Sequence, residues 1–281
     1  MSRWLRSELR AIICPGQVAF FLVERKLGWR GLQRTVHGPH VVPCDRGDDG
    51  SQAWRPALQA MEAMLPGFAD GKTTATAILS NHFVHYTLVP WRAELADEKE
   101  DLSFARHCFT KVYGEIARQW ELRLNQEAPG TSNLASAVDA ELLDALRGVF
   151  GKAGIPLSSI QPHLMAVYND FRGDLRQRST WFALLEPGHL CLALLHQGRW
   201  ARVRSLRIGR AWLDEFPQIL ERESYLADTA TVPHEVYLWD SGLGEKALPE
   251  IDSWQFHALI HGPKHAPESA QVWPFAMAMW G

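Results

Sequence analysis

The chain has 281 residues, of which 46% are hydrophobic, so it is long enough for about two domains with buried cores. Its 29 basic and 32 acidic residues give a net charge of −3, which argues against a general nucleic-acid-binding protein, because neutralising phosphates needs a basic surplus. The sequence lacks an apolar run of about 20 residues and the apolar core of a secretion signal, so we expect a cytoplasmic protein without a membrane span.

The first ten residues, MSRWLRSELR, combine apolar side chains with arginines. This pattern fits peripheral association with an anionic membrane surface, but we favour an ordinary frayed terminus. The four cysteines show no C-x-x-C spacing, which is typical of a reducing cytoplasm.

The first half of the chain opens with a predicted β-meander at Arg10–Ile13, Gln17–Arg25 and Trp29–His37, where apolar runs lie between Gly and Pro residues. A helix follows near residues 54–65, because its apolar residues share one face.

Two further strands are predicted at Thr74–Ser80 and His82–Trp91, so that His82 and His85 fall on opposite faces of one strand. A strong helix with Asp97 as its cap follows. Its apolar residues recur at three- and four-residue steps, at Leu102, Ala105, Phe109, Val112 and Ile116.

Strands near Glu121–Asn125 and Asn133–Val138 precede a helix that begins at Asp139 and ends at Gly154. Residues 158–171 predict a short strand and a helix. The polar segment Arg172–Ser179 then predicts a boundary between two domains, residues 1–175 and residues 176–281.

The second half repeats the plan of the first. Its predicted elements are strands at Trp181–Glu186, His189–His196 and Trp200–Ile208, a helix with Trp212, Phe216, Ile219 and Leu220 on one face, a strand at Glu235–Trp239, and a short helix at Val272–Trp280.

Two hairpins resemble copies of each other. Ile12–Leu22 turns at Pro15-Gly16, and Leu184–Leu194 turns at Pro187-Gly188. Each joins two apolar strands and leads into a basic, Trp-containing segment. A fold that is built twice usually binds its ligand or partner between the halves.

Three further segments contribute, with these hairpins, to a resemblance to a known protein family. They are the helix end Phe150–Ile155, the strand and loop Val236–Gly244, and the terminal Phe275–Trp280. The chain thereby resembles the actin and hexokinase superfamily, and more closely the PilM-like proteins of type IV pilus assembly and the cytoplasmic L-protein domain of type II secretion. The resemblance implies an α+β fold of two ribonuclease H-like domains with mixed sheets and flanking helices.

In ATP-binding members of that superfamily, each hairpin turn reads Asp-x-Gly followed by Ser or Thr, because carboxylates hold hydrated magnesium and amides with hydroxyls cradle phosphate. Here the turns read Cys-Pro-Gly-Gln and Glu-Pro-Gly-His, and the adenosine loop keeps one of two glycines. The resemblance therefore implies a degenerate nucleotide cleft without bound ATP or magnesium. Its residues are Gly16, Gln17, Glu186, Gly188, His189 and Gly242.

Loss of these groups predicts very poor phosphoryl transfer. By the resemblance, we expect a non-catalytic scaffold that binds a membrane-protein tail or an assembly ATPase at the inner face of the inner membrane. The alternative is a nucleotide-dependent kinase or ATPase of the same superfamily. It would need Glu186 and a second acid, for which Asp170, Asp174 and Asp240 are candidates.

The segment Trp200–Arg210 places Arg202 and Arg204 on one strand face, with Arg199 near its start. This stripe is a candidate docking site for an acidic partner. It also fits a strand edge that is protected by charge, and the sequence leaves both interpretations open.

Two other motifs are interpreted as structural. Gly67–Thr73 is one residue short of a P-loop and follows a helix instead of a strand, so it predicts a helix end and a loop. His257, His261 and His265 are spaced four apart, but Gly262-Pro263 interrupts any helix that would align them. We therefore expect no metal site and no catalytic residue.

Overall fold

The computed structural model describes residues 7–28, 31–47, 52–95, 97–209, 211–227, 232–240 and 253–259. These residues divide into two compact units. The first unit contains the described residues up to Val84 together with Asp139–Val167, and the second contains His85–Val138 together with the described residues from Tyr168 onward. The domain boundary predicted between residues 175 and 176 stays a prediction.

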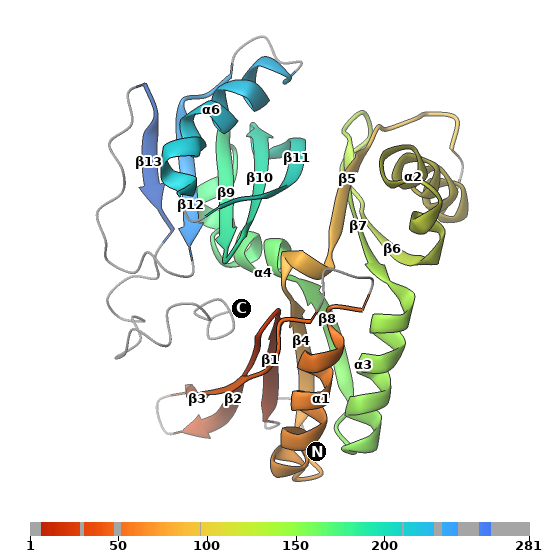
Figure 1. The fold of residues 1–281 in the computed structure, drawn as a ribbon, viewed down its shortest axis with the longest axis vertical. Helices are drawn as coiled ribbons and strands as arrows, with labels where there is room; N and C mark the ends of the chain where they lie inside the picture. The colour runs from red at the N-terminus through yellow and green to blue at the C-terminus, as the bar shows by residue number, and fades with distance from the viewer. Residues whose placement is uncertain are drawn as a thin grey trace. The chain divides into compact units, whose positions relative to one another are not determined.

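The first unit contains a mixed sheet, the first sheet, whose described strands run in the order β3-β2-β1-β4-β8. Strands β1, β2 and β3 form an antiparallel meander, whereas β4 is parallel to β1 and β8 is parallel to β4 (Figure 1). The bounds are β1 Glu8–Cys14, β2 Gln17–Gly28, β3 Gly31–Pro43, β4 Thr74–Leu79 and β8 Leu157–Pro162.

Helices α1 (Arg55–Met64) and α3 (Ala140–Lys152) pack against each other and against this sheet. Phe20 on β2 contacts Phe68, in the 3₁₀ turn Leu65–Phe68 that follows α1, with 5.4 Å between the ring centres. The sheet face that carries Phe20 is therefore the face next to α1. The Asp139 carboxylate caps α3 by accepting from the Glu141 N–H, and the helix starts next to Asp139, where the sequence predicts its start.

The second unit contains a second sheet with the strand order β11-β10-β9-β12-β13. Strand β10 is antiparallel to β9 and β11, and β12 is parallel to β9 and β13. The second sheet therefore repeats the order and the directions of the first, as the paired hairpins predict. The bounds are β9 Thr180–Glu186, β10 His189–His196, β11 Arg199–Arg207, β12 Glu235–Asp240 and β13 Gln255–Ala258.

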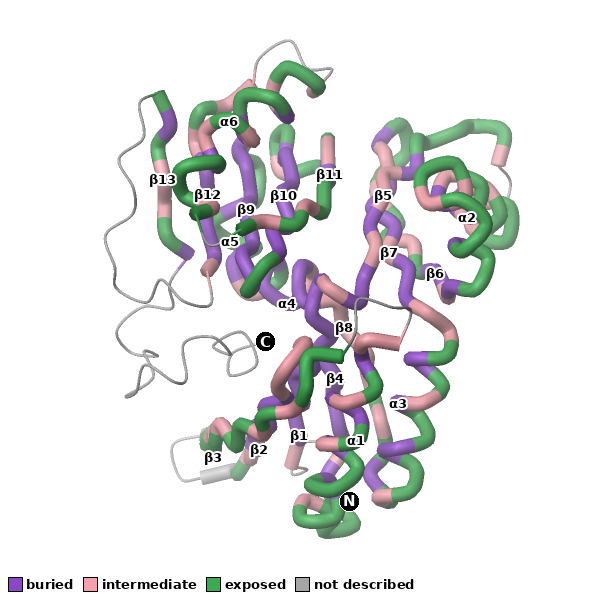
Figure 2. The backbone as a smooth tube through the Cα atoms, in the orientation of Figure 1, coloured by how far each residue is buried: buried purple, intermediate pink, exposed green. Residues whose placement is uncertain are grey.

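The core of the second sheet is continuous and apolar. Strands β9 and β10 are buried along almost their whole length (Figure 2). Helix α6 (Trp212–Tyr225) packs Phe216 and Leu220 into this core, against Trp181 among others. The spacing of these helical residues matches the predicted apolar face.

A small sheet in the same unit has the described order β5-β7-β6, with bounds β5 His85–Val89, β7 Asn133–Asp139 and β6 Trp120–Asn125. Helix α2 (Glu98–Tyr113) packs against β5 and β6. The Asp97 carboxylate accepts hydrogen bonds from the N–H groups of Lys99 and Glu100, so the predicted cap is confirmed.

Helix α2 ends earlier than the periodicity predicts. Gly114 has a φ of +78°, which ends the helix, and the chain continues as a 3₁₀ turn over Glu115–Gln119. Val112 and Ile116 are exposed, so the apolar face that we predicted does not extend to them.

The predicted strand His82–Trp91 is also shorter. Ser80 accepts a hydrogen bond from the His82 N–H and caps a 3₁₀ turn over Asn81–Phe83, so β5 starts only at His85. The prediction that His82 and His85 lie on one strand is therefore wrong.

Residues 158–171 form β8 and helix α4 (His163–Asp170), close to the prediction, but the polar segment after them contains a further helical turn, α5 (Arg172–Leu175). His257 lies on β13, whereas His261, His265 and the predicted helix Val272–Trp280 lie outside the described residues. No helix in the described ranges has both the length and the apolar character needed to cross a bilayer.

Candidate functional site

The first hairpin turn, between β1 and β2, is covered by the chain that follows β3. Gly16 has a φ of +88°, which favours glycine, and a Cβ at this position would lie 3.1 Å from Cγ of Arg46. The Cys44 N–H donates to the Gly16 carbonyl at 2.9 Å. Gln17, the predicted phosphate-side residue, starts β2 opposite Cys14. The turn therefore carries Cys14 at the position where the resemblance implies a carboxylate, and the Arg46 side chain lies against Gly16.

The second hairpin turn brings Glu186, Gly188 and His189 together. Glu186 and His189 lie directly opposite each other in the ladder between β9 and β10, and both side chains are buried. Gly188 has a φ of +84°, and its carbonyl accepts a hydrogen bond from the Ile208 N–H. Gly242, the remaining residue of the predicted cleft, lies outside the described residues.

The predicted arginine stripe lies at β11, where Arg202 and Arg204 reach the same carboxylate of α6. Arg202 Nε lies 2.8 Å and Arg204 Nε lies 3.7 Å from Oε2 of Glu223, a residue without solvent exposure. Arg222 Nη2 lies 3.1 Å from the other carboxylate oxygen. We call Arg202, Arg204, Arg222 and Glu223 the Glu223 cluster.

The three predicted arginines differ in how the protein uses them. Arg202 also donates from Nη1 to the Leu226 carbonyl at 3.1 Å, and its side chain is only 23% exposed. Arg199 donates from Nη1 to the Thr131 hydroxyl at 3.2 Å. The Arg204 side chain is 48% exposed. Of the two arginines on the strand face, Arg202 and Arg204, it is therefore the more accessible to a partner.

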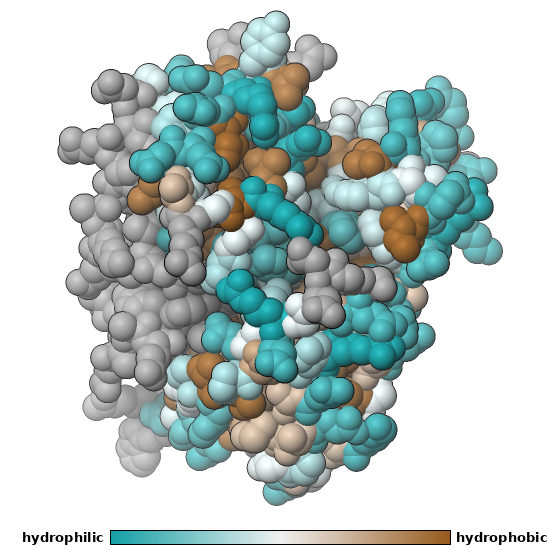
Figure 3. All heavy atoms as spheres, in the orientation of Figure 1, coloured by the Kyte–Doolittle hydropathy of each residue, from teal (hydrophilic) through white to brown (hydrophobic). Residues whose placement is uncertain are grey.

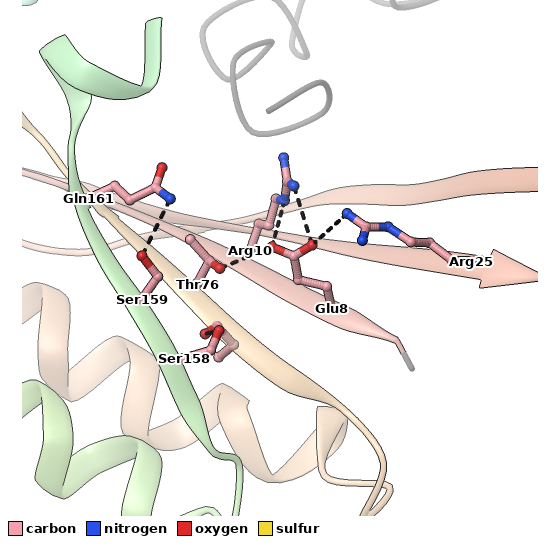
Figure 4. Close-up of polar contacts among 8 residues, drawn as sticks. Glu8, Arg10, Arg25, Thr76, Ser158, Ser159 and Gln161 are labelled. Carbon is pink, nitrogen blue, oxygen red and sulfur yellow. Dashed lines mark hydrogen bonds and ion pairs between the residues drawn. The ribbon is translucent and has the colours of Figure 1, made fainter. Parts of the chain in front are cut away.

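A second polar cluster lies on the first sheet and was not predicted. The Glu8 carboxylate accepts hydrogen bonds from Arg10 Nε at 3.1 Å and from the Thr76 hydroxyl at 3.0 Å, and Arg25 Nη2 lies 3.4 Å away (Figure 4). We call Glu8, Arg10, Arg25 and Thr76 the Glu8 cluster. Arg10 is only 5% exposed, so this carboxylate compensates a buried positive charge.

The Glu8 cluster lies on the sheet face opposite α1. Arg10 pairs with Thr76 across β1 and β4, whereas the neighbouring Ala11 pairs with Phe20, which faces α1. Figure 4 shows the cluster beside Ser159 and Gln161, which β8 contributes to the same area. Glu8 and Arg10 are two residues apart on a strand, and this spacing was the sequence signal that could have revealed the pair.

The environment of Glu8 contains opposing effects on its pKa. Burial raises the pKa, but the charge of Arg10 and the hydrogen bonds from Arg10 and Thr76 outweigh burial and hold the pKa below its ordinary value. Glu8 is therefore ionised at neutral pH.

The small sheet carries an aromatic cluster around His85. The His85 ring stacks on Trp120 with 3.9 Å between the ring centres, and Tyr113 lies 5.0 Å away. Burial lowers the pKa of His85 from 6.5 to about 4. His85 is therefore a neutral packing residue at pH 7.

This pKa predicts a stability change in mild acid. Between pH 6.5 and about 4 the unfolded chain binds a proton that folded His85 does not, so the free energy of unfolding should fall by about 2 kcal/mol as the pH decreases through that range. His85→Phe should remove this part of the pH dependence. Thermal melts of both proteins between pH 4 and pH 8 test the prediction. If the melting temperatures of the two proteins changed with pH in parallel, the prediction would be contradicted.

Two adjoining pockets of about 300 and 280 Å³ lie beside α2 and β6. They share Leu102 and Leu122, and Arg106 and Arg123 lie among their other lining residues. The Arg106 guanidinium donates to the carbonyls of Ala117 and Trp120, so it serves the local backbone.

No protein-family model matches the chain, and no curated protein does. Solved structures do. The cytoplasmic domain of EpsL from Vibrio cholerae, an inner-membrane component of the type II secretion system, is 9% identical and superposes with a TM-score of 0.59 over 97% of this chain and 94% of that one. A PilM–PilN type IV pilus biogenesis complex gives 18% identity and a TM-score of 0.63, with 96% of each chain covered.

A Bacteroides thetaiotaomicron protein of unknown function, described as having an actin-like ATPase fold, gives 8% identity and a TM-score of 0.54 over 88% of this chain and 87% of that one. This chain has the actin-like ATPase fold. The repeated strand order of the two sheets agrees with it, and the predicted α+β class and the predicted resemblance to PilM-like and EpsL-like proteins are confirmed. In this actin-like chain, the two hairpin turns occupy equivalent positions of the two sheets.

Proposed function

We propose that this chain is a non-catalytic assembly or scaffold protein of a type IV pilus or type II secretion-like system. It would bind a cytoplasmic tail of a membrane protein or an assembly ATPase at the inner face of the inner membrane. The similarity to EpsL and PilM over almost the whole chain supports this proposal at the level of the fold. Peripheral attachment through residues 1–10 and the lack of nucleic-acid binding stay predictions.

The observation that carries the proposal is the chemistry of the first hairpin turn. The sequence Cys14-Pro15-Gly16-Gln17 supplies neither the carboxylate for hydrated magnesium nor the hydroxyl for phosphate. The Cys44 N–H engages the Gly16 carbonyl, and Arg46 lies against the turn. Phosphoryl transfer depends on positioning and on electrostatic stabilisation, so a turn with these changes argues against an ATPase or a kinase.

Calorimetric titration of the full chain with magnesium ATP and with a non-hydrolysable analogue tests this function. We expect no binding with a Kd tighter than about 1 mM, because the turn lacks the ligands that hold the metal and the phosphates. The matched comparison is the double variant Cys14→Asp and Gln17→Thr, which restores the pattern of the ATP-binding proteins at this turn. Magnesium-dependent binding by the unaltered chain would overturn the proposal and favour the kinase alternative with Glu186.

A further inference from the structure

An exposed surface of arginine and apolar side chains lies where the last turn of α6 meets β11. Arg222 is followed at three- and four-residue steps by Tyr225 and Leu226, so these side chains leave the same side of the helix end. Arg204 on β11 joins them, because Arg204 and Arg222 both reach Glu223. We call Arg204, Arg222, Tyr225 and Leu226 the arginine–tyrosine surface.

The charges of this surface are unbalanced. Glu223 is fully buried and supplies one negative charge, whereas three guanidinium groups lie within 3.7 Å of it. Arg202 donates hydrogen bonds to Glu223 and to the Leu226 carbonyl, and these bonds connect β11 to α6. Arg204 and Arg222 are about half exposed and carry the excess positive charge into solvent.

The apolar part of the surface is unusually accessible. The Tyr225 residue is 91% exposed and Leu226 is 50% exposed. On the face shown in Figure 3, hydrophilic and hydrophobic atoms adjoin near α6. A single exposed apolar residue is ordinary, but a tyrosine beside arginines has the composition of binding hot spots in protein interfaces.

We propose that the arginine–tyrosine surface binds an acidic segment of a protein partner that carries an aromatic or aliphatic side chain. Carboxylates of the segment pair with Arg204 and Arg222, and its apolar side chain packs on Tyr225 and Leu226. The inference rests on the proposed function as a docking protein and specifies the chemistry of its partner. Glu223 accepts two hydrogen bonds from Arg222, which limits the motion of that guanidinium and lowers the entropy cost of binding through it.

The charge distribution on α6 favours a peptide over an anionic membrane. Asp214, Glu215 and Glu221 are exposed on the same helix, and a negatively charged lipid surface would repel them. Electrostatic membrane binding typically uses clusters of about four to eight basic residues. Asp214 and Glu215 lie about two helical turns before Arg222, so a short peptide can contact the two arginines without reaching them, whereas Glu221 borders the surface beside Arg222.

The test uses the full chain and a fluorescein-labelled peptide with the sequence Glu-Asp-Leu-Phe-Glu-Asp-Leu-Glu, with fluorescence anisotropy as the readout. The acidic peptide should bind, and a matched peptide with Lys in place of each acid should not. The double variant Arg204→Ala and Arg222→Ala and the single variant Tyr225→Ala should each weaken binding by about tenfold. Added salt should weaken binding of the acidic peptide to the unaltered chain.

Two matched control variants lie in the second unit but in an earlier part of the chain than β11 and α6. Arg118→Ala removes an exposed arginine paired with Glu115, and Val112→Ala removes an exposed apolar side chain. Neither should change peptide affinity. Because Tyr225 is almost fully exposed, Tyr225→Ala should fold normally even if the double arginine variant does not.

Equal binding of both peptides, or unchanged affinity in the Tyr225→Ala and double arginine variants, would overturn the inference. The inference would likewise be overturned in favour of a membrane surface if the unaltered chain did not bind the acidic peptide but sedimented with phosphatidylglycerol vesicles, and if Tyr225→Ala abolished that sedimentation. These results are independent of the ATP titration, so a failure here leaves the non-catalytic function standing if magnesium ATP does not bind.

Discussion

Arg202→Ala is expected to destabilise the second unit by about 3 kcal/mol, whereas Arg204→Ala should cost less than about 1 kcal/mol. The reason is the position of the two guanidinium groups. Arg202 lies 2.8 Å from the fully buried Glu223 carboxylate and is itself mostly buried, so its loss leaves a buried charge with weaker compensation. Arg204 lies 3.7 Å away and is about half exposed, so solvent already screens its contribution.

Urea unfolding, followed by tryptophan fluorescence, measures the difference between these variants. Hydrogen exchange of the amides in β11 and α6 assigns the loss to the second unit, because the two units need not unfold in one step. The double variant Arg202→Met and Glu223→Met should recover most of the lost stability, since it removes both buried charges together. Equal destabilisation by Arg202→Ala and Arg204→Ala would contradict the assignment of Arg202 as the structural partner of Glu223.

Glu8→Gln is expected to destabilise the first unit at pH 7 by about 3 kcal/mol. The substitution keeps the shape of the side chain but removes the charge that compensates the buried Arg10 guanidinium. It also weakens the contacts with Arg25 and with the Thr76 hydroxyl.

The same variant tests the pH dependence of the Glu8 cluster. The pKa of Glu8 is lowered in the folded state, so its stabilisation is complete above the unfolded value of 4.5 and is lost as the pH falls through the folded value. The stability difference between the unaltered chain and Glu8→Gln should therefore shrink in acid. Glu62→Gln is the matched control, because the half-exposed Glu62 side chain pairs with the exposed Lys152, and it should cause no measurable change. A Glu8→Gln protein as stable as the unaltered chain at pH 7 would refute this account.

Local signals along the chain predict most of the fold. The Pro-Gly turns at Gly16 and Gly188 interrupt apolar runs, and the resulting hairpins form equivalent parts of the two sheets. Asp97 and Asp139 cap helices where their sequence positions indicate. The failures also have local causes, since the Ser80 cap and the positive φ of Gly114 end elements that hydrophobic periodicity alone would extend.

The polar clusters were only partly predictable, because they depend on which elements pack together. The alternation of β11 places Arg202 and Arg204 on one face, but their common partner Glu223 belongs to a helix that follows in the sequence. Glu223 continues the helical spacing of Phe216 and Leu220, so a charged residue on the buried face was a signal that could have been used. Thr76 joins Glu8 only because β4 pairs with β1.

The first unit is discontinuous, and this affects the order in which it can form during translation. The chain leaves the unit after Val84 and returns at Asp139, and in the small sheet between these points His85 pairs with Ala137. Strand β8 and helix α3, which complete the first sheet and cover it, are encoded after that insertion. On the ribosome, the first sheet can therefore be completed only after the whole intervening segment has been synthesised, because its last strand, β8, pairs with β4.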